Sequence, residues 1–353
     1  MIDRGYPTSK RDPIRAIGQV IDAVCGPYPV VLLDGAPLSG VSRRICEAAV
    51  NLPPDSRVII GKAAELHRIV DSLKAGEPLR GSDLYVVVLD DLSPADLVLL
   101  GAEVLEAIIP HATVLAGINS ELLERILADR SPITGAARTA VLEYGWRISM
   151  PFAMTPLERA MIRVNHPDLK PGPSIAATMV GGEGLLERYV GADPQHRDGQ
   201  LLVQAAVDAR RCGVHRSLSE TELYHLFAAR VDDDGSDLDE RFAMALEWAC
   251  TTPPHAGCGL LFRAAGEDEG WKVLSYLAAA DDGFRRHPVR AIPDLAWPAA
   301  LAALSPADAY AIGISAHLYG RQREAVVAFQ RAAAEDQGPA INTAATAALA
   351  HIS

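Results

Sequence analysis

The sequence predicts an α/β domain built on a parallel sheet, followed by a mostly α-helical region. Up to about Pro151, short apolar runs rich in β-branched residues alternate with stretches of helical periodicity. This alternation is typical of a parallel sheet with helices on both faces. Beyond Pro151 the strand-like runs nearly vanish, while helical periodicity continues.

Five strands and four intervening helices are expected in the first domain. The expected strands are residues 30–33, 57–60, 84–89, 113–116 and 146–150. The expected helices are residues 39–50, 63–75, 95–110 and 120–127. In open parallel sheets, ligands bind at the carboxyl ends of the strands, and the turn from the first strand into the first helix is such a place.

That turn resembles a phosphate-binding loop without its lysine. We call it the glycine loop; its residues are Gly35, Ala36, Pro37, Leu38, Ser39, Gly40, Val41 and Ser42. In the motif G-x-x-x-x-G-K-[ST], the glycines let backbone N–H groups surround the phosphates, the lysine reaches the β- and γ-phosphates, and the hydroxyl binds Mg²⁺. Gly35, Gly40 and Ser42 preserve three of these parts, whereas Val41 occupies the lysine position. Three interpretations follow: the loop binds a nucleotide, it binds a nucleotide weakly, or it is a relic of a phosphate-binding loop that no longer binds one.

Two acids follow the apolar run of the third strand. They are Asp90 and Asp91. An acid at a strand end can hold Mg²⁺, directly or through water, and a second acid can polarise the attacking water. We assign Asp90 to the metal, together with Ser42, and Asp91 to catalysis. The alternative is that both acids only open a turn before Ser93 and Pro94.

Composition argues against several classes of function. The chain has 353 residues, a net charge of −12, 49% hydrophobic residues and 22% charged residues. The acidic balance argues against nonspecific binding to DNA or to membranes, which requires a basic surface. The five cysteines form no CxxC pair, and the sequence has no HExxH motif and no apolar run of about 18 residues that would predict a transmembrane helix. We expect a cytoplasmic protein with reduced thiols and no membrane partner.

The region after Pro151 is expected to contain helices and one β-hairpin. Thr155 and Glu158 predict a helix start, and Ser219 and Glu222 have the spacing of a capping box. The expected helices are residues 155–164, 174–180, 184–190, 200–211, a helix starting at 219, and 238–250. Alternating patterns over residues 259–264 and 271–277 predict a hairpin. Three helices followed by a hairpin suggest a winged helix.

This winged helix is not expected to read DNA. Its third helix, the usual recognition element, carries Asp239, Glu240 and Glu247 against Arg241. The hairpin tip, residues 267–269, is also acidic. Phosphates would be repelled by such surfaces.

The last helices have the residue spacing of one tetratricopeptide hairpin. Gly313, Gly320, Ala325, Phe329 and Ala332 are 7, 5, 4 and 3 residues apart. Small residues at such positions allow close helix contact, and the aromatic ring fills the core. A single repeat cannot bury its own face, so these helices dock on the preceding domain or belong to a longer array. A plain helical hairpin is the alternative.

The order of these parts resembles the STAND class of P-loop ATPases, which are signalling switches related to AAA+ proteins. Segments 146–163, 185–189, 205–213 and 242–249 look like those of actinobacterial members that carry tetratricopeptide arrays. The resemblance covers nearly the whole chain. It divides the chain into a P-loop nucleotide-binding domain over residues 1–151, a helical lid over 152–195, a winged-helix domain over 196–300 and tetratricopeptide-like helices over 301–353.

The resemblance implies ATP or ADP with Mg²⁺ as ligands. In the family, the lid and winged helix close over ADP, and exchange for ATP opens the molecule and drives oligomerisation. The residues expected around the phosphates are Gly35, Ala36, Pro37, Ser39, Gly40, Val41, Ser42 and Arg43. Asn119 would sense the γ-phosphate, although Asn after Gly is also ordinary turn chemistry. Pro173 lies roughly where the family's adenine-side Gly-x-Pro motif falls.

The main departure from the family is Val41. Losing one charge-assisted contact, such as that between the motif lysine and a phosphate, costs on the order of 2–3 kcal/mol of binding free energy. Arg43 and Arg44 are close in sequence, but they lie in the first helical turn and need not point at the loop. The leading hypothesis is therefore a STAND-like switch or adaptor, at most a slow ATPase, that acts through a protein partner, an effector subunit or further copies of itself.

Two other hypotheses remain open at this point. The first is a non-enzymatic scaffold with a relic P-loop, which Val41 favours. The second is a DNA-associated AAA+-type ATPase, because such proteins also join an ATPase core to a winged helix. The acidic surface makes nucleic acid an unexpected partner.

Overall fold

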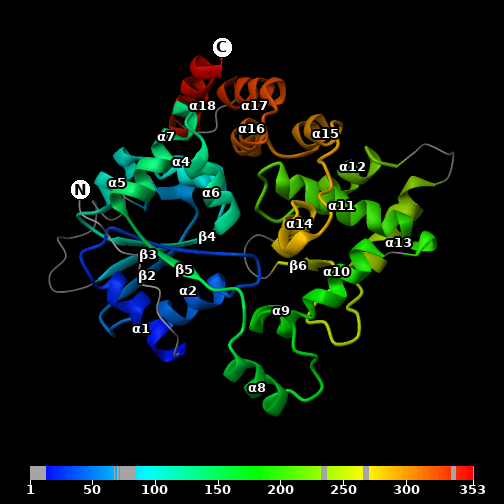
Figure 1. The fold of residues 1–353 in the computed structure, drawn as a ribbon. Helices are drawn as coiled ribbons and strands as arrows, with labels where there is room; N and C mark the ends of the chain where they lie inside the picture. The colour runs from blue at the N-terminus through cyan, green and yellow to red at the C-terminus, as the bar shows by residue number, and fades with distance from the viewer. Residues whose placement is uncertain are drawn as a thin grey trace.

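The computed structural model describes residues 13–66, 68, 69, 71, 84–191, 193–231, 237–264, 270–334 and 339–352. A sheet domain lies on one side of the molecule and a helical region on the other (Figure 1). Within the described ranges, every helix is too short or too polar to span a lipid bilayer.

The five predicted strands are confirmed and form one parallel sheet. They are β1 Val30–Gly35, β2 Arg57–Ile60, β3 Tyr85–Leu92, β4 Thr113–Asn119 and β5 Gly145–Met150. The order across the sheet is β2-β3-β4-β1-β5, so β1 lies between β4 and β5. Strand β1 is buried along its whole length, as expected for a strand covered on both faces.

Helices cover both faces of the sheet. The helices of this domain are α1 Pro13–Val24, α2 Val41–Val50, α4 Pro94–Leu99, α5 Ala102–Ile108, α6 Ser120–Ala128 and α7 Gly135–Thr139. Alternate residues of β1 belong to two different apolar cores: Val31 and Leu33 pack in the core that includes α1 and α2, whereas Val30 and Leu32 pack in the core that includes α4 to α7. The period of two along the strand explains this division.

The single helix predicted over residues 95–110 is wrong. Two helices, α4 and α5, occupy this stretch and break at Gly101, whose backbone is extended with ψ 165°. A Cβ atom at Gly101 would lie 3.4 Å from the Cβ of Ala136, so α7 approaches this break closely. The expected helix at residues 63–75 begins as a short 3₁₀ turn, Ala63–Glu65, and most of its second half lies outside the described residues.

The helical region contains the expected helices and a short antiparallel hairpin. Its helices are α8 Pro156–Asn165, α9 Ile175–Val180, α10 Gly182–Val190, α11 Arg197–Arg211, α12 Glu220–Ala228, α13 Leu238–Cys250 and α14 Ser275–Asp281. The hairpin joins β6 Leu261–Arg263 to β7 Trp271–Val273. The predicted second strand over residues 271–277 is too long, because α14 begins at Ser275 and buries Tyr276 and Leu277. The helix start at Thr155 and the capping box at Ser219 are confirmed, and Thr155 also forms a capping box with Glu158.

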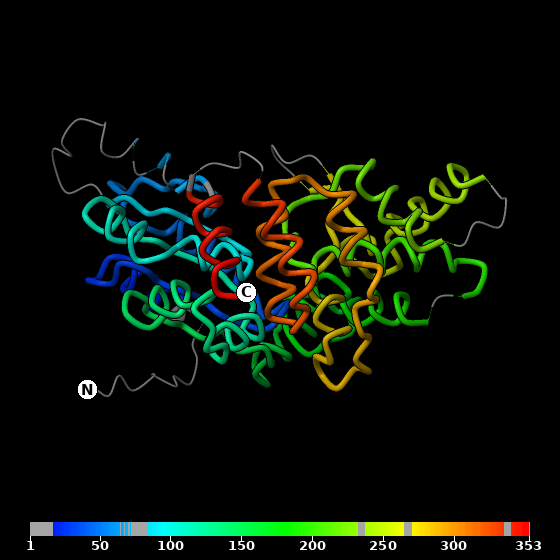
Figure 2. The backbone as a smooth tube through the Cα atoms, turned by 90° about the horizontal axis from the view of Figure 1, so that it is seen from above, coloured from blue at the N-terminus to red at the C-terminus, as the bar shows by residue number. Residues whose placement is uncertain are grey.

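Four further helices join the two halves of the molecule. They are α15 Ala296–Ala303, α16 Ala309–Leu318, α17 Gln322–Ala334 and α18 Pro339–Ile352. Gly313 of α16 allows close contact with Phe329 of α17, since a Cβ at Gly313 would lie 2.5 Å from that ring. Helices α16 and α18 pack against α4 of the sheet domain, and Figure 2 shows α18 in red beside that domain.

Candidate functional site

The two glycines of the predicted motif, Gly35 and Gly40, both stand where the backbone requires glycine. A Cβ atom at Gly35 would lie 2.3 Å from the Ser39 hydroxyl and 3.0 Å from the Cβ of Met150. Gly40 has φ 94° and is the N-cap residue of α2, in a left-handed conformation that favours glycine. The glycine loop therefore turns tightly from β1 into α2 at the carboxyl edge of the sheet.

The start of α2 offers backbone donors to an anion. The first intrahelical hydrogen bond that involves Gly40 runs from the Arg44 N–H to the Gly40 carbonyl at 2.9 Å. The amides of Val41, Ser42 and Arg43 precede it in the helix and belong to the first turn. N–H groups at a helix start, together with the helix dipole, favour phosphate.

Val41 contributes an apolar contact where the motif has a cation. A Cβ at Gly35 would lie 2.9 Å from one Val41 methyl group, and a Cβ at Gly117 would lie 2.8 Å from the other. The Val41 side chain therefore lies between the ends of β1 and β4 and packs on the apolar core beneath α2. The valine is accommodated by packing, not left projecting into solvent.

Ser42 and Asp90, the two predicted metal ligands, lie together. A Cβ at Gly117 would lie 2.9 Å from the Asp90 carboxylate and 2.8 Å from a Val41 methyl group, so Asp90 lies beside the glycine loop. Burial raises the pKa of Asp90, and the nearby Ser42 hydroxyl opposes this shift. No cluster of three or more His, Cys, Asp or Glu side chains suited to a metal occurs in the described part of the chain. A Mg²⁺ ion at Ser42 and Asp90 would therefore take its other oxygen ligands from phosphate and water, as this ion commonly does.

Asp91, the predicted catalytic acid, contacts the helical region. The Arg210 guanidinium, in the last turn of α11, donates to both carboxylate oxygens of Asp91 at 2.6 and 2.8 Å. The Nδ1 atom of His215 lies 3.3 Å from the Asp91 carbonyl oxygen. Burial disfavours the charged carboxylate, but Arg210 and then His215 outweigh it and lower the pKa of Asp91. Asp91 also has φ 55°, a conformation uncommon for a non-glycine residue, which the contacts hold in place.

Two predicted phosphate-side residues have other partners. Arg43 extends away from the loop, because its Nε donates to Glu47 at 2.8 Å and its side chain is 71% exposed. The side-chain Oδ1 of Asn119 accepts from the backbone amides of Glu121 and Leu122 and caps α6. Asn119 therefore serves as the N-cap of α6. It lies at the end of β4, which pairs with β1, the strand that leads into the glycine loop.

The segment around Pro173 lies against the glycine loop. The Ser174 hydroxyl donates to the Leu38 carbonyl oxygen at 2.6 Å, and Ser174 is also the N-cap of α9. A Cβ at Gly182 would lie 3.0 Å from the Leu38 side chain. Pro173 itself accepts a hydrogen bond from the Met154 amide at 3.1 Å. Helices α9 and α10 therefore cover one side of the loop.

Asp34 was not predicted as a site residue. It lies in β1 immediately before Gly35 and is 2% exposed. Arg147 of β5 donates to its two oxygens at 2.6 and 2.9 Å, and the Ser149 hydroxyl donates at 2.9 Å. This buried cluster fixes the end of β1 against β5. In the sequence, only the presence of a single acid directly after the apolar run of residues 30–33 pointed to Asp34.

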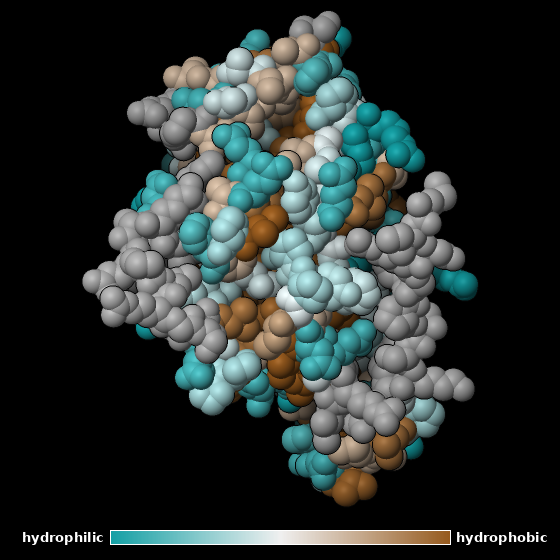
Figure 3. All heavy atoms as spheres, turned by 90° about the vertical axis from the view of Figure 1, so that its left-hand side faces the viewer, coloured by the Kyte–Doolittle hydropathy of each residue, from teal (hydrophilic) through white to brown (hydrophobic). Residues whose placement is uncertain are grey.

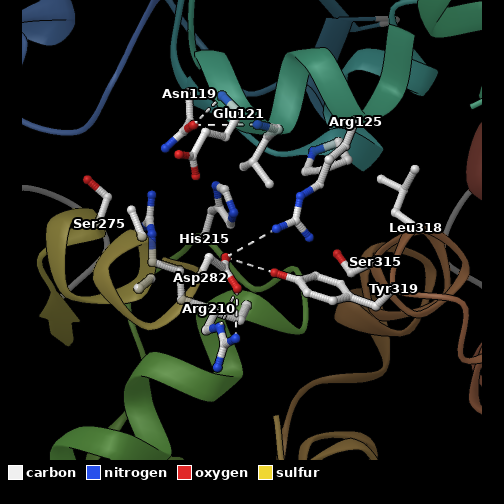
Figure 4. A pocket seen from close by; sticks show the side chains of 15 residues that line it. Asn119, Glu121, Arg125, Arg210, His215, Ser275, Asp282, Ser315, Leu318 and Tyr319 are labelled. Carbon is white, nitrogen blue, oxygen red and sulfur yellow. Dashed lines mark hydrogen bonds and ion pairs between the residues drawn. The ribbon is translucent and has the colours of Figure 1, made fainter. Parts of the chain in front are cut away.

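A pocket lies where the sheet domain, the helical region and α16 meet. Its lining includes Asn119, Arg125, Arg210, His215, Asp282 and Tyr319. Asp282 accepts from Arg211 at 2.7 Å and from the Tyr319 hydroxyl at 2.9 Å, and it lies 3.8 Å from Arg125 (Figure 4). These contacts tie the three parts together close to the Asp91 ion pair.

No protein-family model and no curated protein matches this chain. Among solved structures, the chain is similar to a Signal Transduction ATPase with Numerous Domains (STAND) protein with a tetratricopeptide repeat sensor from Pyrococcus horikoshii, with a TM-score of 0.39 and 11% sequence identity. The alignment covers 94% of this chain and 51% of that one, so this chain spans about half the length of that protein.

Proposed function

We propose that this chain is a STAND-like nucleotide-dependent switch or adaptor in the cytoplasm. It binds ATP or ADP with Mg²⁺ at the glycine loop and acts through protein partners. The observation that carries this proposal is the position of the Asp90 carboxylate next to Val41 and near Ser42, beside a glycine loop whose geometry requires Gly35 and Gly40. A hydroxyl and a carboxylate next to first-turn amides form the oxygen and N–H surroundings that a magnesium-bound phosphate needs.

Turnover is proposed to be slow or absent. The loop has no lysine to stabilise charge that develops on the transferred phosphoryl group. Asp91, the residue that would polarise water, is held by Arg210. An ion-paired carboxylate of lowered pKa is a poor general base.

Calorimetry of the purified protein with ADP and ATP, with and without Mg²⁺, tests this proposal. We expect Mg²⁺-dependent binding that Asp90→Asn weakens at least about tenfold, the equivalent of one lost charge-assisted contact of about 1.4 kcal/mol. Asp294→Asn is the matched control, because Asp294 is 83% exposed and pairs with Arg321 far along the chain. A folded wild-type protein that binds neither nucleotide at millimolar concentration would contradict the proposal.

Protein contacts are proposed for two surfaces of the helical region. An open groove between α12, α13 and β7 is lined by Glu220, Tyr224, Asp239, Phe242, Glu247 and Trp271. Its acids are exposed and its aromatic rings are partly or fully buried, so a segment with basic and apolar side chains would complement it. On α8, the apolar side chains of Leu157, Met161 and Val164 are 69%, 53% and 79% exposed.

These α8 residues recur at a helical spacing and form one stripe. Figure 1 places α8 at the lower end of the molecule, and Figure 3 shows hydrophobic surface at that end. A partner protein, an effector subunit or a further copy of this chain would bury this stripe. Exposed apolar side chains that gather in one patch commonly mark a surface for interaction with another protein.

A non-enzymatic scaffold is the second candidate function. The packing of Val41 between β1 and β4 and the ion pair of Asp91 favour it, because both are consistent with architecture alone. If it is correct, Asp90→Ala leaves partner binding and thermal melting unchanged.

A DNA-associated ATPase is the third candidate function. The acidic surface of α13 argues against it, and only salt-sensitive binding to duplex DNA at physiological ionic strength would support it.

A further inference from the structure

The glycine loop lacks a cation at position 41, so a phosphate bound there would need its charge balanced from elsewhere. Two nearby cations are already engaged along α2. Arg43 and Arg44 both pair with Glu47, at 2.8 and 3.3 Å. Arg210 is held by Asp91. None of these three guanidinium groups is free to replace the missing lysine without breaking an ion pair.

Lys272, in β7 of the β6–β7 hairpin, lies on the side of the helical region that contacts Asp91. Its neighbour Trp271 exchanges two backbone hydrogen bonds with Leu218, at 2.7 and 2.9 Å. Leu218 lies three residues after His215 in the chain. The ring of His215 in turn contacts the Asp91 carbonyl oxygen. Through residues 215–218, β7 is therefore connected to Asp91 at the end of β3, and Figure 1 shows β6 between the sheet and α10.

The orientation of Lys272 fits this position. Side chains alternate along a strand, so Lys272 faces away from Trp271, whose ring lies under Arg263, and from Val273, which is buried. The positive charge of Lys272 lowers the pKa of both Asp90 and Asp91, although by less than their nearer partners do. It is half-buried, and among the described residues no ion pair within 4.0 Å involves it.

We propose that Lys272 supplies, from the hairpin of the helical region, the cation that the glycine loop lacks. The proposal rests on the proposed nucleotide-binding function. The flexible four-carbon stem of lysine lets its ammonium act as a point charge on a phosphate oxygen without the fixed geometry of arginine. Since Lys272 belongs to a different part of the molecule from the loop, its contact with a bound diphosphate would link nucleotide occupancy to the docking of the hairpin on the sheet.

The test is calorimetric titration of Lys272→Met with ADP, ATP and adenosine in the presence of Mg²⁺. We expect the affinity for ADP and ATP to fall at least about tenfold, as for one lost charge-assisted contact, while the affinity for adenosine is unchanged. Adding Val41→Lys to Lys272→Met should restore at least half of the lost affinity on a logarithmic scale, because it returns the ammonium to the motif position. Lys170→Met, at an exposed site, is the matched control.

Each outcome decides between distinct ideas. If the wild-type protein binds no nucleotide, the proposed function fails and this proposal fails with it. If the wild-type protein binds ADP and Lys272→Met binds it equally well, only the role of Lys272 is overturned. If Lys272→Met melts at a lower temperature without nucleotide but keeps its ADP affinity, Lys272 serves only to neutralise Asp90 and Asp91, and the proposal is again wrong.

Discussion

Asp208→Asn is expected to destabilise the helical region by about 3–5 kcal/mol, the usual cost of leaving buried charges without their partner. Asp208 of α11 is 1% exposed and is surrounded by three guanidinium groups. Arg211 donates to it at 3.2 Å, Arg290 donates twice at 2.7 and 2.9 Å, and Arg230 also donates to it. The asparagine amide keeps the shape of the side chain but removes its charge and turns one acceptor into a donor.

Arg230 should account for most of this effect. Arg211 retains Asp282 and Arg290 retains Asp281 after the substitution, at 2.7 and 2.5 Å. The Arg230 side chain is 8% exposed, and among the residues that the structure describes its ion-pair partner is Asp208. The variant therefore leaves one buried cation without its counter-charge, a state far more costly than the loss of a surface pair.

Urea unfolding followed by circular dichroism measures this prediction. Asp294→Asn is the control, because it also removes an acid from an arginine pair, but at a side chain that is 83% exposed, and it should change stability by no more than about 0.5 kcal/mol. The midpoint of the transition, not an extrapolated free energy, is the quantity to compare, since a chain with two halves need not unfold in one step. A shift for Asp208→Asn no larger than that of the control would refute the role assigned to this cluster.

The sheet was predictable because its signal is local. The run of residues 30–33 has no charge and is fully buried in β1, and the same holds for the apolar part of β3.

The ends of helices and strands were less predictable where tertiary packing decides them. Gly101 breaks a helical pattern because α7 lies against it, and the second strand of the hairpin stops at Val273 because Tyr276 and Leu277 are needed in a helical core.

The candidate site was predictable on one side only. Gly35, Gly40, Ser42 and Asp90 lie at or just after the carboxyl ends of strands in one parallel sheet, so their neighbourhood follows from topology. The partners that arrive from the helical region carry no local signal. Arg210 lies 119 positions after Asp91, and nothing in its helix distinguishes it from an ordinary basic residue in a last turn, where cations are common.

A second large effect is expected from pH, through His215. Burial, and next the positive charge of Arg210, lower the pKa of His215 to about 4, while Asp91 acts in the opposite direction. An unfolded chain has a histidine pKa of about 6.5. Between these two values the unfolded state binds a proton that the folded state excludes, so stability falls as the pH falls from about 6.5 to about 4, by up to about 3 kcal/mol. Above pH 6.5 this contribution is constant.

The comparison of His215→Gln with the wild-type protein isolates this contribution. Other groups titrate in the same experiment: burial raises the pKa of Asp308, whereas the pKa of Asp129 is lowered, chiefly by hydrogen bonds that outweigh its burial. These carboxyl groups are present in both proteins, so the difference between the two stability profiles cancels them. Glutamine keeps a polar contact to the Asp91 carbonyl oxygen and cannot be protonated, so its profile should be flatter between pH 6.5 and 4.5. His166→Gln, at an exposed position after α8, is the control.

The location of His215 gives this titration a structural consequence. His215 and Arg210 hold Asp91, the contact that joins the end of β3 to α11. A proton on His215 would place a second cation beside Arg210 in a buried position, so acid should separate the helical region from the sheet before either part unfolds. Limited proteolysis at pH 5 should then cleave the wild-type protein between its two halves faster than His215→Gln. Equal cleavage of both proteins, with parallel stability profiles, would show that the histidine remains hydrated and that its burial does not govern the docking.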